Sequence, residues 1–72
     1  MKTEMEAKRI EAFLDMLQTT AVTSGNNLNF SYDNQAEQVI VTGDEELVVN
    51  VHMDSVNATF RDVIRELGRS FN

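Results

Sequence analysis

Residues 28–53, LNFSYDNQAEQVIVTGDEELVVNVHM, decide the fold, because they contain three apolar runs separated by two polar turns. In residues 28–32 apolar and polar side chains alternate, which is the two-residue period of a strand with one buried face. Residues 38–42 are mostly β-branched, and alternation returns in residues 46–53. Because short connections favour antiparallel hairpins over parallel crossovers, we predict a three-stranded antiparallel meander with residues 38–42 as its middle strand.

The two faces of the third run differ in polarity. Its alternation predicts four apolar residues on one face, namely Leu47, Val49, Val51 and Met53. The opposite face is expected to present Val48, Asn50 and His52. On the middle strand the pattern leaves open whether this outer face receives Ile40 or the pair Val39 and Val41. The uncovered face of the sheet is therefore predicted to be mixed, not fully polar.

A helix is predicted before the sheet, over residues 3–23. Its core-facing stripe follows from a rotation of about 100° per residue and consists of Ile10, Phe13, Leu14, Leu17 and Ala21. A second apolar strip beside it consists of Met5, Ala12 and Met16. Glu4 and Lys8 have the i,i+4 spacing of a stabilising ion pair. Gly and Asn tolerate the left-handed conformation that ends helices, so this helix is expected to stop at residues 24–27.

A second helix is predicted after the sheet, because Asp54 and Ser55 are both good N-caps. The apolar residues that follow recur at helical spacing and define its core-facing side: Val56, Phe60, Val63, Ile64, Leu67 and Phe71. The opposite side has an arginine line, Arg61, Arg65 and Arg69, with acidic residues at i,i+3 spacings that partly relieve its repulsion. Two amphipathic helices and one meander predict an α+β fold, a two-layer αβββα arrangement with both helices on one face of the sheet.

The chain is short enough that we expect a single domain, residues 1–72. A chain of 72 residues buries roughly 60% of its unfolded surface, which does not suffice for two cores. No apolar run approaches the roughly 20 residues of a membrane span, and the charged start of the chain does not resemble an export signal. The absence of cysteine excludes a disulfide framework, so we expect a cytoplasmic protein without membrane contact.

Residues suited to covalent chemistry are sparse. The single histidine, His52, has Asp54 two residues away, but no motif supplies the nucleophile or oxyanion site that a catalytic base would serve. One histidine without cysteine argues against a closed transition-metal site, and the acidic turn, Asp44, Glu45 and Glu46, lacks the ligand spacing of a calcium loop. No glycine-rich phosphate-binding motif is present. We therefore predict no enzyme activity and no cofactor.

Charge is distributed unevenly along the chain. Six basic and 12 acidic residues give a net charge of 6 − 12 = −6, and residues 10–60 contain no Lys or Arg. The basic residues, at positions 2, 8, 9, 61, 65 and 69, are all expected in the two helices. Direct nucleic-acid binding is not expected, because it depends on cationic side chains that neutralise phosphates. A charged partner of this chain should instead be a protein with a basic surface.

Self-association is the leading hypothesis for the uncovered surfaces. The mixed outer face and the methionine strip expose more apolar area than a chain of this size usually does, and a two-fold homodimer would bury it. In this hypothesis the arginine line pairs with carboxylates of a second copy or of another partner. The predicted interaction surface comprises Met5, Met16, Ile40, Asp44, Glu45, Glu46, Val48, Asn50, His52, Arg61, Arg65 and Arg69.

Two functions remain open on the sequence alone. The first is a small acidic, non-catalytic protein-interaction module that associates with itself or with another protein. The second is an acidic inhibitor, of the kind encoded by phages, whose carboxylates imitate a phosphate backbone and occupy a basic nucleic-acid-binding protein. Binding that is lost at high salt favours the inhibitor, because surface attraction is screened, whereas salt-insensitive binding favours the module.

Overall fold

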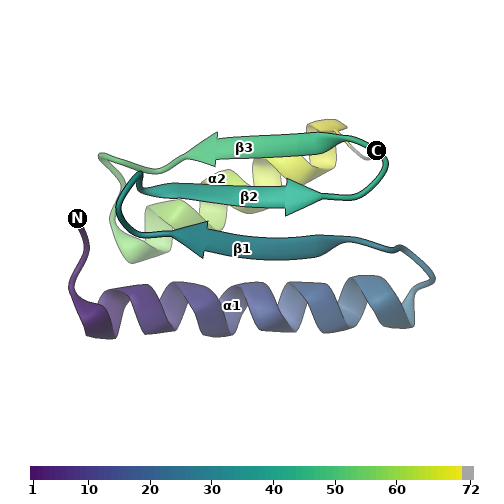
Figure 1. Cartoon of the computed structure of the whole chain (residues 1–72), viewed down its shortest axis with the longest axis horizontal. Coiled ribbons are helices and arrows are strands. Elements are labelled where there is room, and N and C mark those ends of the chain that lie inside the picture. The colour runs from purple at the N-terminus through teal and green to yellow at the C-terminus, as the bar shows by residue number, and fades with distance from the viewer. Residues whose placement is uncertain (71–72) are drawn as a thin grey trace.

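The chain folds in the order helix, three strands, helix, and the computed structural model describes residues 1–70 of it (Figure 1). Its elements are α1 (Glu4–Thr23), β1 (Asn29–Asp33), β2 (Gln38–Thr42), β3 (Glu46–Asn50) and α2 (Val56–Ser70). The strands form one antiparallel sheet in the order β1-β2-β3. The predicted fold class is therefore confirmed, including the middle position of residues 38–42.

Local sequence explains both ends of α1. At its start the Thr3 hydroxyl accepts a hydrogen bond from the Glu6 N–H, and the Glu6 carboxylate accepts one from the Thr3 N–H. These hydrogen bonds with Thr3 lower the pKa of Glu6 below its usual range. At its end Gly25 adopts a left-handed φ of 85°, and the Asn26 N–H reaches the Ala21 carbonyl at 2.8 Å, as in a Schellman motif. The predicted termination at residues 24–27 is confirmed.

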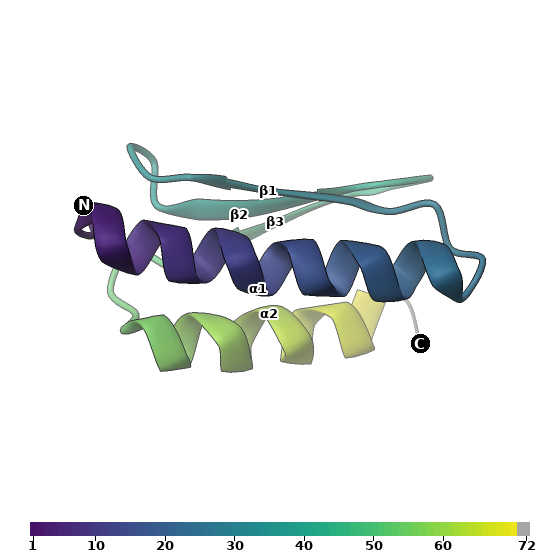
Figure 2. The same cartoon turned by 90° about the horizontal axis from the view of Figure 1, so that it is seen from below.

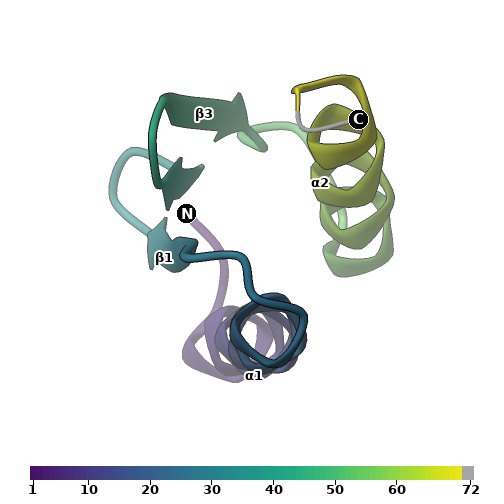
Figure 3. The same ribbon diagram turned by 90° about the vertical axis from the view of Figure 1, so that its right-hand side faces the viewer.

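Both helices cover the same side of the sheet and share one core. Figure 3 shows the sheet curving over α1 and α2, and Figure 2 shows the two helices side by side, running in the same direction. Phe13 of α1 stacks on Phe60 of α2 with ring centroids 4.3 Å apart. The core between helices and sheet contains the fully buried side chains of Ile10, Val39, Val41, Val51 and Val63.

β3 is shorter than the sequence indicates, which corrects the prediction for Met53. The Asn50 side chain accepts a hydrogen bond from the His52 N–H at 3.0 Å, and the Asp54 N–H donates to the Val51 carbonyl at 3.1 Å. These bonds turn the chain out of the sheet after Asn50. Val51 still enters the core, but Met53 lies on the turn and is 88% exposed, so its predicted place on the core face is wrong.

The buried side of α2 also differs from the predicted stripe. Ser55 caps the helix as expected, since its hydroxyl accepts a hydrogen bond from the Ala58 N–H at 3.1 Å. Thr59 is fully buried, and its hydroxyl donates to the Ser55 carbonyl of the same helix at 2.9 Å. α2 therefore buries its Thr59 side, whereas Ile64 is 55% exposed, so the predicted core position of Ile64 is wrong. The prediction for Phe71 lies outside the described residues.

Candidate interaction surface

The uncovered face of the sheet contains the side chains that alternate with the core residues. Val39 and Val41 point into the core, so Ile40 is the residue of β2 on the outer face. Ile40 pairs with Val48 of β3 in the centre of this face, where Ile40 is half-buried and Val48 is 46% exposed. Asn50 lies at one end of the same face. Ile40, Val48 and Asn50, three residues of the predicted surface, are therefore neighbours.

The two edges of the sheet differ in what lies beside them. α1 runs alongside β1 (Figure 1), and the Gln18 side chain accepts a hydrogen bond from the Phe30 N–H at 3.1 Å. Gln18 thus occupies the position where another strand would have to pair with β1. Along the described part of the chain, neither helix covers the outer edge of β3 (Figure 3).

A second group of exposed apolar side chains lies on the helices. Met5 and Met16 of α1 are exposed, as their positions outside the core stripe predict. The Phe13 and Phe60 rings stack on each other, and the two helices run in the same direction (Figure 2). Met16 follows Phe13 in α1 by about one helical turn, and Ile64 follows Phe60 in α2 by the same interval. The core separates these residues from the outer face of the sheet, so the predicted surface is divided between two sides of the molecule.

The arginine line points away from the core, as predicted, and is paired within its own helix. Arg65 lies 2.7 Å from the Asp62 carboxylate, and Arg69 lies 3.5 Å from that of Glu66, both at i,i+3 spacing. Arg61 contacts Asp62 at 3.3 Å. Exposed pairs of this kind contribute between about 0 and 1 kcal/mol. The arginines are therefore accessible, but part of their charge is already neutralised in α2.

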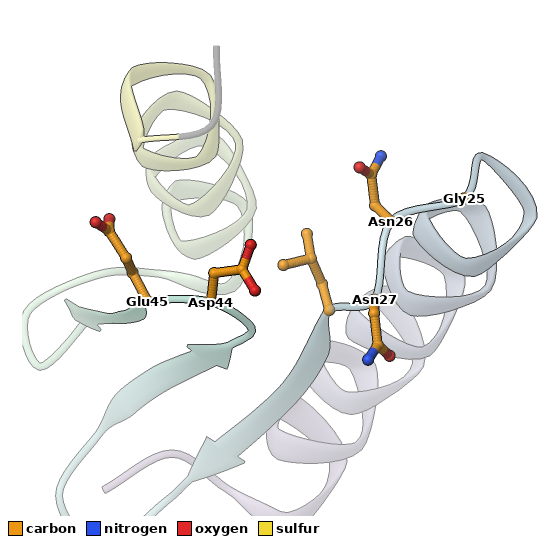
Figure 4. Close-up of a pocket in the computed structure, with 6 residues that line it drawn as sticks. Gly25, Asn26, Asn27, Asp44 and Glu45 are labelled. Carbon is orange, nitrogen blue, oxygen red and sulfur yellow. The ribbon is translucent and has the colours of Figure 1, made fainter.

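The acidic turn adjoins a pocket of about 590 Å³ between the α1–β1 connection and the β2–β3 turn (Figure 4). Its lining residues are Gly25, Asn26, Asn27, Leu28, Asp44 and Glu45. The turn approaches the connection so closely that a Cβ at Gly43 would lie 2.7 Å from the Leu28 side chain. Within residues 1–70 no three His, Asp or Glu residues are grouped to hold a metal ion. Asp44 and Glu45 are exposed on this turn, whereas the exposed Glu46 is the first residue of β3 and shares the outer face with Val48.

His52 belongs to a polar cluster that the sequence did not indicate. Its ring Nδ1 contacts Oε2 of Glu37, whose side chain is only 6% exposed. The Lys2 side chain is equally buried; its Nζ lies 3.7 Å from Oε1 of Glu37 and donates to the Val51 carbonyl at 3.0 Å. The α-amino group of Met1 lies 3.2 Å from the same Oε1. One buried carboxylate thus gathers three cationic or titratable groups.

Glu37 is fixed in this cluster by its backbone as well as by its carboxylate. It adopts a left-handed φ of 52°, which is uncommon for a residue other than glycine, and its carbonyl accepts a hydrogen bond from the Val51 N–H at 2.9 Å. The hydrogen bond from the α-amino group of Met1, followed by that of His52, lowers the pKa of Glu37 below its usual range. In the described part of the chain, no hydroxyl side chain that could act as a nucleophile forms a hydrogen bond with His52.

The cluster ties the start of the chain to the β1–β2 turn. The Asn34 side chain accepts hydrogen bonds from the Lys2 N–H at 3.2 Å and the Tyr32 hydroxyl at 2.8 Å, and it donates to the Lys2 carbonyl at 3.0 Å. Burial, together with the charge of Glu37, raises the pKa of Tyr32. Lys2 therefore lies ahead of α1, and the prediction that every basic residue lies in a helix is wrong at this position. Its acceptor at Val51 is 49 residues away, which no local pattern indicates.

Two carboxyl groups interact near the start of α2, that of Asp54 in the connection between β3 and α2 and that of Asp62 in the helix. Oδ2 of Asp54 is buried, and within the described residues it accepts no hydrogen bond. A hydrogen bond with Asp62, together with burial, raises the pKa of Asp54, and the same hydrogen bond lowers the pKa of Asp62. The two carboxyl groups therefore titrate together, and ionisation of Asp54 is disfavoured in the folded chain.

We expect the variant D54N to be more stable than the native chain at neutral pH. A raised pKa in the folded chain means that the contribution of protonated Asp54 is complete below the usual aspartate pKa of about 3.9 and is lost as pH rises. Asparagine keeps an N–H donor for Asp62 and does not ionise, so the gain should grow with pH. Thermal unfolding between acidic and neutral pH measures it, with D44N on the exposed turn as the charge-matched control. Equal shifts in both variants would contradict the raised pKa of Asp54.

Comparison with known proteins identifies no homologue: no protein-family model, no curated protein and no solved structure matches the chain. Neither helix in residues 1–70 has the length and apolar character needed to cross a membrane. The residues of the predicted interaction surface lie in three places. These are the outer sheet face, the helix layer with the methionines and arginines, and the acidic turn; His52 lies apart, at Glu37.

Proposed function

We propose that this chain is a non-catalytic protein-interaction module that associates with itself as a homodimer. The observation that supports the proposal most is the adjacent pair Ile40 and Val48 in the centre of the uncovered sheet face. No lysine or arginine lies on any of the three strands, so no cationic side chain interrupts this face. A small chain that keeps apolar side chains there has a surface suited to burial against a second copy.

The burial of two carboxyl groups favours the interaction module over an acidic inhibitor. Of the acidic residues in the basic-free stretch, Glu37 is buried against Lys2, and one carboxyl oxygen of Asp54 is buried. These groups contribute little to an exposed negative surface that imitates nucleic acid. We also propose a cytoplasmic location, because nothing in a cysteine-free composition requires an oxidising compartment.

Sedimentation equilibrium over a range of concentrations tests self-association. We expect the mass to rise from 8.2 kDa toward 2 × 8.2 = 16.4 kDa at tens of micromolar. The dissociation constant should change little when salt is raised to about 0.5 M, because apolar contacts are not screened. A mass that stays at 8.2 kDa would contradict the proposal. Capture of a basic partner that is released at high salt would favour the inhibitor.

A further inference from the structure

The open edge of β3 can be defined residue by residue from two hydrogen bonds. The Val51 N–H donates to the Glu37 carbonyl of the neighbouring chain segment at 2.9 Å, so odd-numbered residues direct their backbone groups toward β2. The Phe30 N–H of β1 donates to Gln18, away from β2. Both hydrogen bonds agree with one pattern, because successive residues of β2 bond alternately to β1 and to β3. The backbone N–H and C=O groups of Glu46, Val48 and Asn50 therefore point away from the sheet.

This edge has few of the devices that usually prevent strand pairing, since Glu46 is its one charged residue. It spans five residues, about 17 Å, and contains no lysine and no proline. Among residues 1–70 no hydrogen bond is recorded to the outward backbone groups of Glu46, Val48 or Asn50, whereas Gln18 blocks the corresponding edge of β1. Figure 3 shows α2 on the core side of β3 and no helix beyond the outer edge of this strand.

We propose that a second copy of this chain pairs with β3 in antiparallel orientation, about a two-fold axis at Val48. The two sheets then become one six-stranded sheet, and three pairs of outward-facing residues exchange two hydrogen bonds each. This inference rests on the proposed self-association and specifies how it is achieved. The occupant is a second copy because the edge is self-complementary in this register.

Side-chain charge selects the same register. With Val48 opposite Val48 of the second copy, Glu46 faces Asn50, and no two carboxylates stand opposite each other. A register centred on Glu46 would oppose two glutamates and leave Asn50 unpaired. On the outer face the cross-strand neighbours Ile40 and Val48 meet the same two residues of the second copy, which forms one apolar row across the axis. On the core face Leu47 comes opposite Val49 of the second copy, which covers a half-buried leucine.

Single cysteines test the register directly, because the chain has no cysteine of its own. A hydrogen-bonded pair has Cα atoms about 5.5 Å apart, which a disulfide can bridge, so V48C should form a covalent dimer under mild oxidation. E46C and N50C are the matched controls: neither should cross-link alone, but an equimolar mixture should. Cross-linking of E46C or N50C alone, without that of V48C, would overturn the inference.

Removal of the central N–H tests the pairing without cysteines. We expect V48P to raise the dimer dissociation constant about 100-fold or more, while the monomer stays folded because this N–H faces away from β2. V48K, which opposes two like charges at the axis, should also weaken the dimer. In the native chain, amide exchange at Glu46, Val48 and Asn50 should slow as protein concentration rises, with no such change at Leu47 or Val49.

The outcomes separate this inference from the proposed function. A dimer that V48P and V48K leave intact, with unchanged exchange at Val48, would overturn edge pairing and keep self-association. A chain that remains monomeric at all concentrations would overturn both.

Discussion

Replacing Ile10 with alanine is expected to lower the midpoint of thermal unfolding by at least about 8 °C. Ile10 is fully buried where α1 meets the sheet, so I10A loses apolar contacts and leaves a cavity that costs about 2–5 kcal/mol. A chain of 72 residues has a total stability of only about 4–11 kcal/mol. Each kcal/mol shifts the midpoint of such a domain by about 4–8 °C, so the loss is readily measured by circular dichroism.

Two variants show whether packing causes this loss. I10V removes one methylene and should cost about 0.5–1.5 kcal/mol, in proportion to the smaller cavity. M16A on the exposed side of the same helix should change stability by no more than about 0.5 kcal/mol. Alanine is the better helix former, so lost helix propensity does not explain a decrease in I10A. Similar losses in I10A and M16A would contradict the placement of the core.

Replacing Lys2 with methionine is expected to destabilise the chain by about 1–3 kcal/mol. The methionine side chain has a similar length and suits a buried position, but it leaves the Val51 carbonyl without its donor and Glu37 without one of its cationic neighbours. Urea unfolding measures the loss as a lower midpoint with an unchanged slope. The expected effect is large for a residue that precedes every helix and strand.

The matched control is K8M, which removes the same charge from an exposed ion pair. Lys8 lies 3.4 Å from Glu4 at i,i+4 spacing on the outside of α1, where such pairs contribute about 0.3–0.5 kcal/mol. K2M should therefore be clearly less stable than K8M although both chains have the same net charge. If the two variants unfold at the same urea concentration, the buried cluster at Glu37 does not stabilise the fold.

The sequence predicted the candidate surface only in part. Strand periodicity placed Val48 and Asn50 on the outer face, and helical periodicity placed Met5 and Met16 outside the core stripe. Periodicity did not predict that Ile64 would join the exposed residues, because its angle on α2 falls within the apolar sector. The exact rotation of α2 depends on its contact with the sheet, where Thr59 is accommodated by bonding to its own helix.

Local sequence patterns did not predict the polar clusters. Glu37 and Lys2 meet although they are distant in sequence, and the effect of Asp62 on the pKa of Asp54 depends on how the connection between β3 and α2 packs against the helix. Similarly, the meander predicted two sheet edges without indicating which one is closed. That difference follows from the position of Gln18 beside Phe30.

By itself, the sequence determined the order of elements, the middle strand, both ends of α1 and the start of α2, because periods, caps and glycine conformations act over a few residues. Tertiary structure alone decided which groups Glu37 gathers and which strand edge is open to a partner. Those features depend on contacts between residues far apart in the chain, and such contacts exist only once helices and sheet have docked.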